Sequence, residues 1–126
     1  MDTKKKYVIL GSGPAGTFAA KKIRSEDPSA SITIVTEDSY PLYYRPNLPD
    51  YLLGSMAIEN LIMFKDSWYQ ENNINIKLNS SVANISLKEK DMELEGGEFI
   101  EFDKLLIATG SAPGLPAANI TDSANI

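Results

Sequence analysis

The 126 residues of the sequence contain no cysteine and no histidine. Without thiols or imidazoles, these residues cannot supply a zinc site, a thiolate nucleophile, a serine–histidine relay or a redox-active disulfide. Basic residues are also the minority, since 12 Lys and Arg against 17 Asp and Glu leave a formal net charge of -5. This balance argues against a nucleic-acid partner and against binding to an anionic membrane surface.

Long apolar stretches are missing as well. No run approaches the roughly 18 apolar residues of a transmembrane helix, and no hydrophobic signal segment follows Met1. We therefore expect a soluble, cytoplasmic protein. Because 43% of the residues are hydrophobic, the chain has material for one modest core, so we expect one domain or most of one, and no second domain.

A glycine-rich motif follows the first apolar run of the chain. Residues 7–10 predict a buried strand, and the next six have the G-x-G-x-x-G spacing of a dinucleotide-binding turn: Gly11, Ser12, Gly13, Pro14, Ala15 and Gly16. In such a turn the first glycine allows the sharp reversal, the second lets the backbone approach a pyrophosphate, and the third lets helix and strand pack closely. Pro14 suits the first turn of the following helix, whose N–H groups and dipole would face the phosphate charge.

The residues after the motif complete a βαβ pattern. We predict a helix over residues 14–25 and then a β-branched strand over residues 32–35 that leads to Glu37. Glu37 lies about 20 residues beyond the turn, the spacing at which a carboxylate accepts hydrogen bonds from a ribose. A solvated acid at a strand end is the plainer alternative. The helix residues expected to form the apolar stripe are Ala15, Phe18, Ala19 and Ile23.

Residues 38–53 are predicted to form a proline-stiffened, aromatic loop. The segment has three prolines and four tyrosines and is too apolar for a linker, so we interpret it as a cover beside the nucleotide turn. Arg45 is its single cation and could contact a phosphate or a planar ring. Packing of the arginine stem against the tyrosines is an equally weighted alternative.

The remaining residues predict a short helix over 65–72, a strand over 74–78 and an antiparallel meander over 81–87, 91–94 and 99–102. The apolar run at 104–108 is typical of a strand buried on both faces. We therefore assign residues 1–110 to an incomplete α/β domain, Rossmann-like, with a central parallel sheet and an inserted three-stranded meander. Residues 111–126 are assigned to a crossover linker or tail.

The order of these parts resembles the FAD-binding domain of the pyridine nucleotide-disulfide oxidoreductase superfamily. The resemblance rests on the GSGPAG turn, the strand ending in Glu37, the YYRPNLPDYL loop, the DSWYQENNI helix, the meander and the LLIATGSAP segment. It covers nearly the whole chain, and GSGPAG with a distant ATG is more specific than either motif alone. The nearest branch contains rubredoxin reductase, NADH oxidase-like enzymes and the FAD/NAD-binding part of the large nitrite reductase subunit.

This resemblance implies roles for individual residues. The six residues of the glycine turn would cradle the FAD pyrophosphate, and Glu37, with Asp38 beside it, would bind the adenosine ribose. The loop with Arg45 and Pro46 would approach the flavin and the pyrophosphate, and Val82 would meet the adenine through its backbone. Three residues would pass close to the cofactor where the chain leaves the domain: Ala108, Thr109 and Gly110.

The resemblance also implies what the chain does not do alone. Relatives with a redox disulfide carry a cysteine where this sequence has residues 45–47, so electrons would pass from flavin to an external acceptor of the rubredoxin, nitrite-reductase or oxygen type. A second GxGxxG domain for NAD(P)H, a return strand with a Gly-Asp motif and an interface domain are absent from these 126 residues. We expect a fragment of a longer NAD(P)H-dependent flavin oxidoreductase, or a truncated product, that is inactive by itself.

Two other functions stay open. The chain could be a non-catalytic NAD- or ADP-binding module, in which the ATG segment is incidental. It could also be a ligand-free fragment whose exposed strand edges drive self-association. Retention of FAD, binding of NAD or ADP without flavin, and concentration-dependent oligomerisation without ligand distinguish the three.

Overall fold

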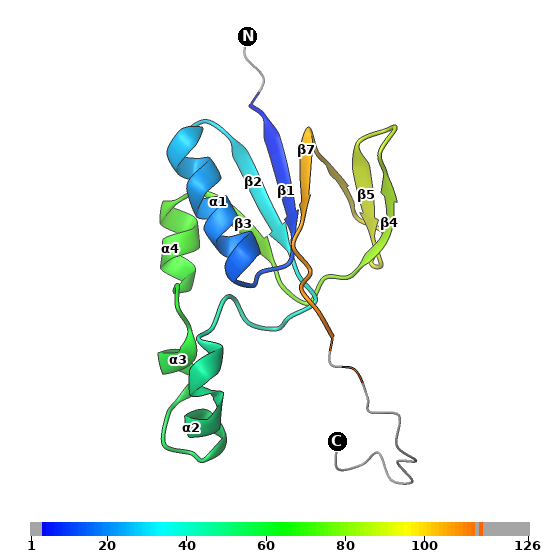
Figure 1. The fold of residues 1–126 in the computed structure, drawn as a ribbon. Helices are drawn as coiled ribbons and strands as arrows, with labels where there is room; N and C mark the ends of the chain where they lie inside the picture. Colours follow the sequence, from blue (N-terminus) through cyan, green and yellow to red (C-terminus); the bar gives the residue numbers. More distant parts are fainter. Residues whose placement is uncertain (1–3, 113, 115–126) are drawn as a thin grey trace, which may run out of the picture.

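The fold of this protein, seen in a computed structural model that describes residues 4–112 and 114, has three layers (Figure 1). The central layer is a parallel sheet in the order β3 (Ile74–Lys77), β2 (Ser31–Val35), β1 (Lys6–Leu10) and β7 (Lys104–Ile107). Helices α1 (Pro14–Glu26) and α4 (Asp66–Glu71) cover one face. An antiparallel sheet of β4 (Val82–Ser86), β5 (Asp91–Leu94) and β6 (Phe99–Glu101) covers the other. The predicted α/β class, with a parallel sheet and an inserted meander, is confirmed.

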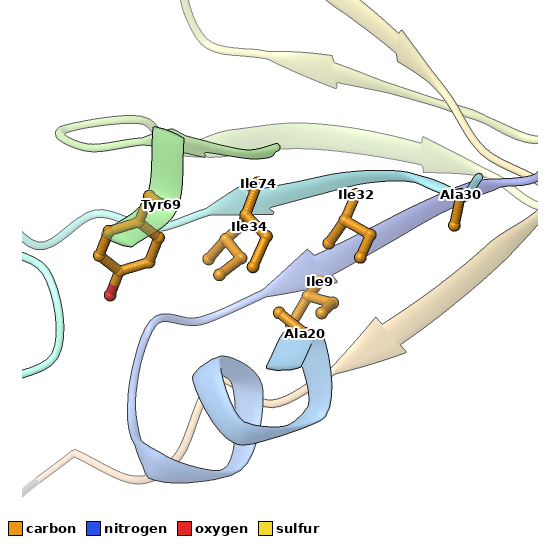
Figure 2. Close-up of a cluster of buried hydrophobic side chains, with 7 residues drawn as sticks. All are labelled: Ile9, Ala20, Ala30, Ile32, Ile34, Tyr69 and Ile74. Carbon is orange, nitrogen blue, oxygen red and sulfur yellow. The ribbon is translucent and has the colours of Figure 1, made fainter. Parts of the chain in front are cut away.

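The central strand β1 contributes to two separate cores because side chains alternate between the faces of a sheet. Ile9 belongs to the cluster under the helices, whereas Val8 and Leu10 belong to the cluster under the meander. Figure 2 shows the helix-side cluster, with Ala20 of α1 facing Ile9. Because both faces of β1 are buried, its sequence over residues 7–10 is a continuous apolar run with no alternating polar residues.

The face that α1 turns to the sheet agrees only in part with the predicted stripe, because Ala19 and Ile23 pack partly buried against the helix-side core but the other two members do not. The buried residues of α1 are Gly16, Thr17 and Ala20, while Ala15 is exposed and the Phe18 side chain is 44% exposed. Small residues on this face allow the helix backbone to come close to β1, which a larger side chain would prevent. Phe18 packs edge-on against the partly buried Phe64, with ring centroids 5.9 Å apart.

Strand β7 is not buried on both faces, so that prediction is wrong. β7 pairs with β1 and forms one edge of the parallel sheet. Leu106 is 40% exposed and Ile107 is 64% exposed. A continuous apolar run has the same pattern in a central strand and in an edge strand, so the sequence pattern alone could not distinguish them.

The predicted loop over residues 38–53 contains short helices. A 3-10 turn over Arg45–Asn47 leads into α2 (Leu48–Leu52), and α3 (Ile58–Leu61) follows. Both helices lie beyond the carboxyl ends of the parallel strands (Figure 1). Pro46 and Pro49 are each the second residue of a helix, within the first turn, where a fixed φ favours the helix and no intrahelical N–H is lost. An isolated bridge between Tyr43 and Ile62 closes the base of this segment.

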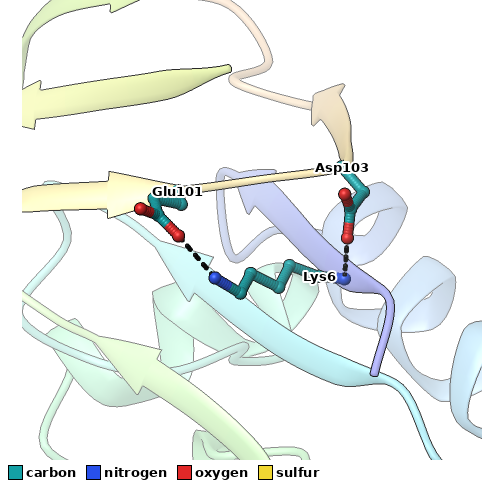
Figure 3. A network of polar contacts seen from close by, with 3 residues as sticks. All are labelled: Lys6, Glu101 and Asp103. Carbon is teal, nitrogen blue, oxygen red and sulfur yellow. Dashed lines mark hydrogen bonds and ion pairs between the residues drawn. The ribbon is translucent and has the colours of Figure 1, made fainter. Parts of the chain in front are cut away.

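Lys6 connects β1 to the last residue of β6 and to the segment between β6 and β7 (Figure 3). Its backbone N–H donates to the Asp103 carboxylate at 2.7 Å, and its ammonium group pairs with Glu101. The hydrogen bond and the charge attraction between the two groups favour their ionised forms, so the pKa of Glu101 is lowered and the pKa of Lys6 is raised. Because both side chains are largely exposed, the pair fixes geometry more than it stabilises the fold.

Tyr69 places a polar atom in the helix-side core. The residue is 2% exposed, and its hydroxyl has no hydrogen-bond partner among residues 4–112 and 114. Burial raises the pKa of Tyr69 above the usual 10.0, and polar contacts with the Leu42 backbone and the Thr17 side chain, which do not meet the geometry of a hydrogen bond, offset part of the rise. Tyr69 therefore keeps an unpaired hydroxyl away from water, which costs stability.

We expect Tyr69→Phe to leave the free energy of unfolding unchanged or to raise it by up to about 1 kcal/mol, because it removes that hydroxyl. Above pH 10 the advantage of the variant should grow. The unfolded wild type releases the tyrosine proton at a lower pH than the folded wild type does, so the free energy of unfolding of the wild type falls as pH rises. Chemical denaturation at pH 7 and at pH 10.5, with the exposed Tyr40→Phe as control, measures both effects. A clear loss of stability in Tyr69→Phe would mean that the hydroxyl is hydrogen-bonded.

The predicted tail lies mostly outside the described residues. Residues 111, 112 and 114 belong to no helix or strand, and nothing describes residue 113 or residues 115–126. The boundary between a domain and a linker therefore stays a prediction. Across residues 4–112 and 114, none of the helices has the length and apolar character needed to cross a membrane.

Candidate dinucleotide-binding site

The glycine turn begins where β1 ends, and Gly11 meets two requirements there. Its φ of +105° is strained for any residue with a side chain. A Cβ at this position would also overlap the carbonyl oxygen of Ala108, the residue that follows β7. The Gly11 N–H donates to the Val35 carbonyl at 2.8 Å, which fixes the turn against the end of β2. A glycine is therefore needed for both backbone conformation and space.

The other two glycines of the motif face in opposite directions. Gly16 is buried, and a Cβ on it would overlap the Gly11 carbonyl oxygen and crowd Ile9. Gly13, the N-cap of α1, has extended φ and ψ of -69° and -173°, and a Cβ on it would meet open space. Gly16 thus packs the helix against the strand, and Gly13 leaves room for a group outside the protein.

The first turn of α1 is suited to an anion. Its leading N–H groups have no intrahelical acceptor, and the positive end of the helix dipole lies there. Pro14 opens the helix, and the turn contains no acidic residue that would compete with a bound anion. A phosphate group placed at this helix end would be stabilised by both the N–H groups and the dipole.

A pocket of about 470 Å³ lies at the carboxyl ends of β1, β2 and β7. Twelve of the predicted residues line it: Gly11, Ser12, Gly13, Pro14, Ala15, Glu37, Asp38, Arg45, Val82, Ala108, Thr109 and Gly110. The structure therefore brings together, around one pocket, segments that are up to about a hundred positions apart in the sequence. Gly16 and Pro46 do not line it, because Gly16 lies behind the turn and Pro46 is on the exposed 3-10 turn.

Sequence reasoning missed five lining residues: Leu10, Val35, Thr36, Ser80 and Ser111. The first three follow from the βαβ unit, because adjacent parallel strands end at the same edge of the sheet. Ser80 reaches the pocket because β3 pairs with β2, and its N–H donates to the Thr36 carbonyl at 2.8 Å. No local motif marks that residue.

Charged side chains stand at the rim of the pocket. Glu37 and Asp38 are exposed at the end of β2, and Arg45 is the one cation among the described lining residues. The Arg45 guanidinium carbon lies 5.8 Å from the centre of the Tyr43 ring. Arg45 thus packs on a tyrosine and also lines the pocket, so neither interpretation of this residue excludes the other.

A βαβ unit with a glycine turn, an open helix N-terminus and an acid at the end of the second strand defines a dinucleotide-binding α/β domain. The model of the family described as pyridine nucleotide-disulphide oxidoreductase matches residues 5–125. The chain belongs to this family.

Relatives of the chain differ in the acceptor that their names specify. NADH-rubredoxin oxidoreductase of Clostridium acetobutylicum is 36% identical over 106 residues, which cover 84% of this chain and 27% of that protein. Nitrite reductase [NAD(P)H] of Bacillus subtilis is 32% identical over 87% of this chain and 14% of its own length. The crystal structure of the covalent putidaredoxin reductase–putidaredoxin complex has a TM-score of 0.83 at 28% identity, covering 94% of this chain and 29% of the matched one. The chain thus spans less than a third of each.

Proposed function

We propose that this chain binds the adenosine diphosphate part of FAD and forms the FAD-binding portion of an NAD(P)H-dependent flavin oxidoreductase. In the complete enzyme, electrons would pass from reduced nicotinamide through FAD to an external acceptor, without a redox disulfide. The observation that carries the proposal is the shared pocket, which the glycine turn, Glu37 and residues 108–110 line together.

The residues around the pocket suit the group they would hold. Its volume of about 470 Å³ is within the usual range for ligand pockets. The open side of Gly13 and the first turn of α1 would hold the pyrophosphate, with Arg45 as a further charge partner. Glu37 would accept hydrogen bonds from the ribose, and Val82 would lie against the adenine. When bound, FAD supplies the capacity to accept a hydride and pass the electrons on.

The position of residues 108–110 favours this function over the NAD- or ADP-binding module. In that alternative the ATG segment has no role, yet Ala108, Thr109 and Gly110 all line the pocket. We assign the electron acceptor of the complete enzyme only to a class, an iron–sulfur or haem-type protein or oxygen. The names of the relatives specify different acceptors, so they do not select one.

Replacing Glu37 with alanine tests the ribose role. A charge-assisted hydrogen bond contributes about 1.5–3 kcal/mol, so we expect the Kd for ADP to rise about tenfold or more. Titration calorimetry measures the Kd for ADP. At about 0.15 M salt, the long-range electrostatic effect of removing one negative charge is screened. Glu95→Ala, which removes an exposed acid in the turn after β5, is the matched control. Equal ADP affinity in the Glu37 and Glu95 variants would contradict the assignment.

A further inference from the structure

The buried serine and threonine residues of the described chain lie together at the glycine turn. Ser12 is 3% exposed, Thr17 is 0% exposed and Thr36 is 6% exposed. They come from the turn, from α1 and from the residue after β2, which are the three parts of the βαβ unit that surround the pocket. Buried hydroxyls cost stability unless they are hydrogen-bonded, so their partners show what they hold in place.

Their hydrogen bonds form one connected set. The Thr17 hydroxyl donates to the Ser12 carbonyl at 2.9 Å. The Ser12 hydroxyl donates to the Thr36 hydroxyl oxygen at 3.2 Å, and the Asp38 backbone N–H donates to that same oxygen at 3.2 Å. Thr36 Oγ1 therefore joins the pyrophosphate side of the pocket to the acidic segment at the end of β2.

The acidic segment is fixed on both sides of Glu37. Before it, the Thr36 N–H donates to the Lys77 carbonyl at 3.0 Å. After it, the Asp38 N–H is held by Thr36 Oγ1, and the Asp38 carbonyl accepts from the Asn79 N–H at 2.9 Å. The exposed Glu37 side chain thus projects from a backbone whose neighbouring peptides are both bonded. The Thr36 hydroxyl is the side-chain group in this arrangement that also contacts the glycine turn.

We propose that the hydroxyls of Ser12 and Thr36 are positioning groups that set Glu37 relative to the glycine turn, so that one nucleotide meets both the anion site and the ribose acceptor. The proposal rests on the function proposed above. Thr36 does not need to touch the nucleotide for this role, because it acts through Glu37. A purely structural role would stabilise the turn without affecting which ribose hydroxyls are recognised.

Thr36→Val and Thr36→Ser separate these roles, because valine keeps the shape of threonine and serine keeps its hydroxyl. Calorimetric Kd values for ADP and for 2′-deoxy-ADP give a ratio that reports ribose recognition at the 2′ position. Both contacts to Thr36 Oγ1 are 3.2 Å, which indicates bonds of moderate strength. We expect Thr36→Val to weaken ADP about threefold to tenfold and to bring the 2′-deoxy-ADP to ADP ratio close to one. Thr36→Ser should keep the wild-type ratio.

A second readout needs no ligand. Amide hydrogen exchange of Asp38 should be protected in wild type and Thr36→Ser and fast in Thr36→Val, because only the hydroxyl accepts that N–H. Ser12→Ala removes the hydroxyl that donates to Thr36 Oγ1. In the Ser12→Ala, Thr36→Val double variant, the change in the Kd ratio should therefore be smaller than the sum of the changes in the two single variants.

The outcomes distinguish the two proposals. If wild type binds ADP and Thr36→Val keeps the wild-type ratio, the positioning role is wrong and the proposed function survives. A Thr36→Val variant that weakens both nucleotides equally also overturns the role, since the hydroxyl would then only stabilise the turn. A wild-type chain that binds neither nucleotide, with Asp38 protected as expected, overturns the proposed function and the ribose role with it.

Discussion

Replacing Gly16 with alanine should lower the free energy of unfolding by about 3 kcal/mol or more. Helix propensity alone predicts the opposite, because alanine in a helix is favoured over glycine by about 1 kcal/mol. The added Cβ, however, would overlap the Gly11 carbonyl oxygen and crowd Ile9. The clashing oxygen belongs to the backbone and cannot rotate away, so α1 must move off β1 and give up buried contacts of Ala20.

The same substitution at Gly13 is the matched control for this experiment. Gly13 and Gly16 are three residues apart, but a Cβ on Gly13 meets open space. Gly13→Ala should therefore cost only the N-cap preference, about 1 kcal/mol or less. Urea denaturation of the two variants and wild type compares them directly. A Gly16→Ala variant as stable as wild type would show that the helix can move away from the turn without penalty.

Valine at Gly13 should have the reverse effect, a loss of nucleotide binding with little loss of stability. The backbone of Gly13 is in an extended conformation that valine adopts without strain. Its side chain would occupy the open space beside the first turn of α1, where we place the pyrophosphate. Because the N–H groups of that turn could no longer reach a phosphate, several charge-assisted hydrogen bonds would be lost together. We expect the Kd for ADP to rise by at least about a hundredfold.

Gly96→Val provides the control for Gly13→Val. Gly96 is exposed in the turn after β5, and a Cβ there also meets open space. This variant should bind ADP as wild type does, and thermal unfolding of both variants checks that each is folded. If Gly13→Val binds ADP with wild-type affinity, the pyrophosphate does not lie at this turn.

The βαβ unit could be predicted because its signals are local and agree with each other. A buried strand, three glycines at fixed spacing and an acid after the second strand each constrain the same fold. The pocket around them was predicted residue by residue only where a motif exists, as at Gly13 and Glu37. Ser80 was missed because it reaches the pocket through the pairing of β3 with β2, which no nearby residue signals.

Other features depend on contacts that the sequence pattern does not record. The predicted apolar stripe of α1 included Phe18, but close packing at Gly16 and Ala20 decides which face meets the sheet, and Phe18 is left 44% exposed. Likewise, Ile107 lies in an apolar run, and only the strand order shows that β7 is at an edge. The helices α2 and α3 are too short for hydrophobic periodicity to indicate them. The bridge between Tyr43 and Ile62, which joins the two ends of the segment that contains them, pairs residues that are distant in the sequence.

If the chain binds FAD through its adenosine diphosphate half, ADP must compete with FAD, and a displacement titration measures this competition. The purified chain is titrated with FAD by calorimetry, first alone and then in the presence of ADP, with Gly13→Val alongside. We predict that wild type binds FAD, that ADP displaces it competitively because both occupy the pocket at the glycine turn, and that Gly13→Val binds neither. FAD binding that ADP does not affect, or no binding of either ligand by a folded wild-type chain, would show that FAD is not held at the glycine turn.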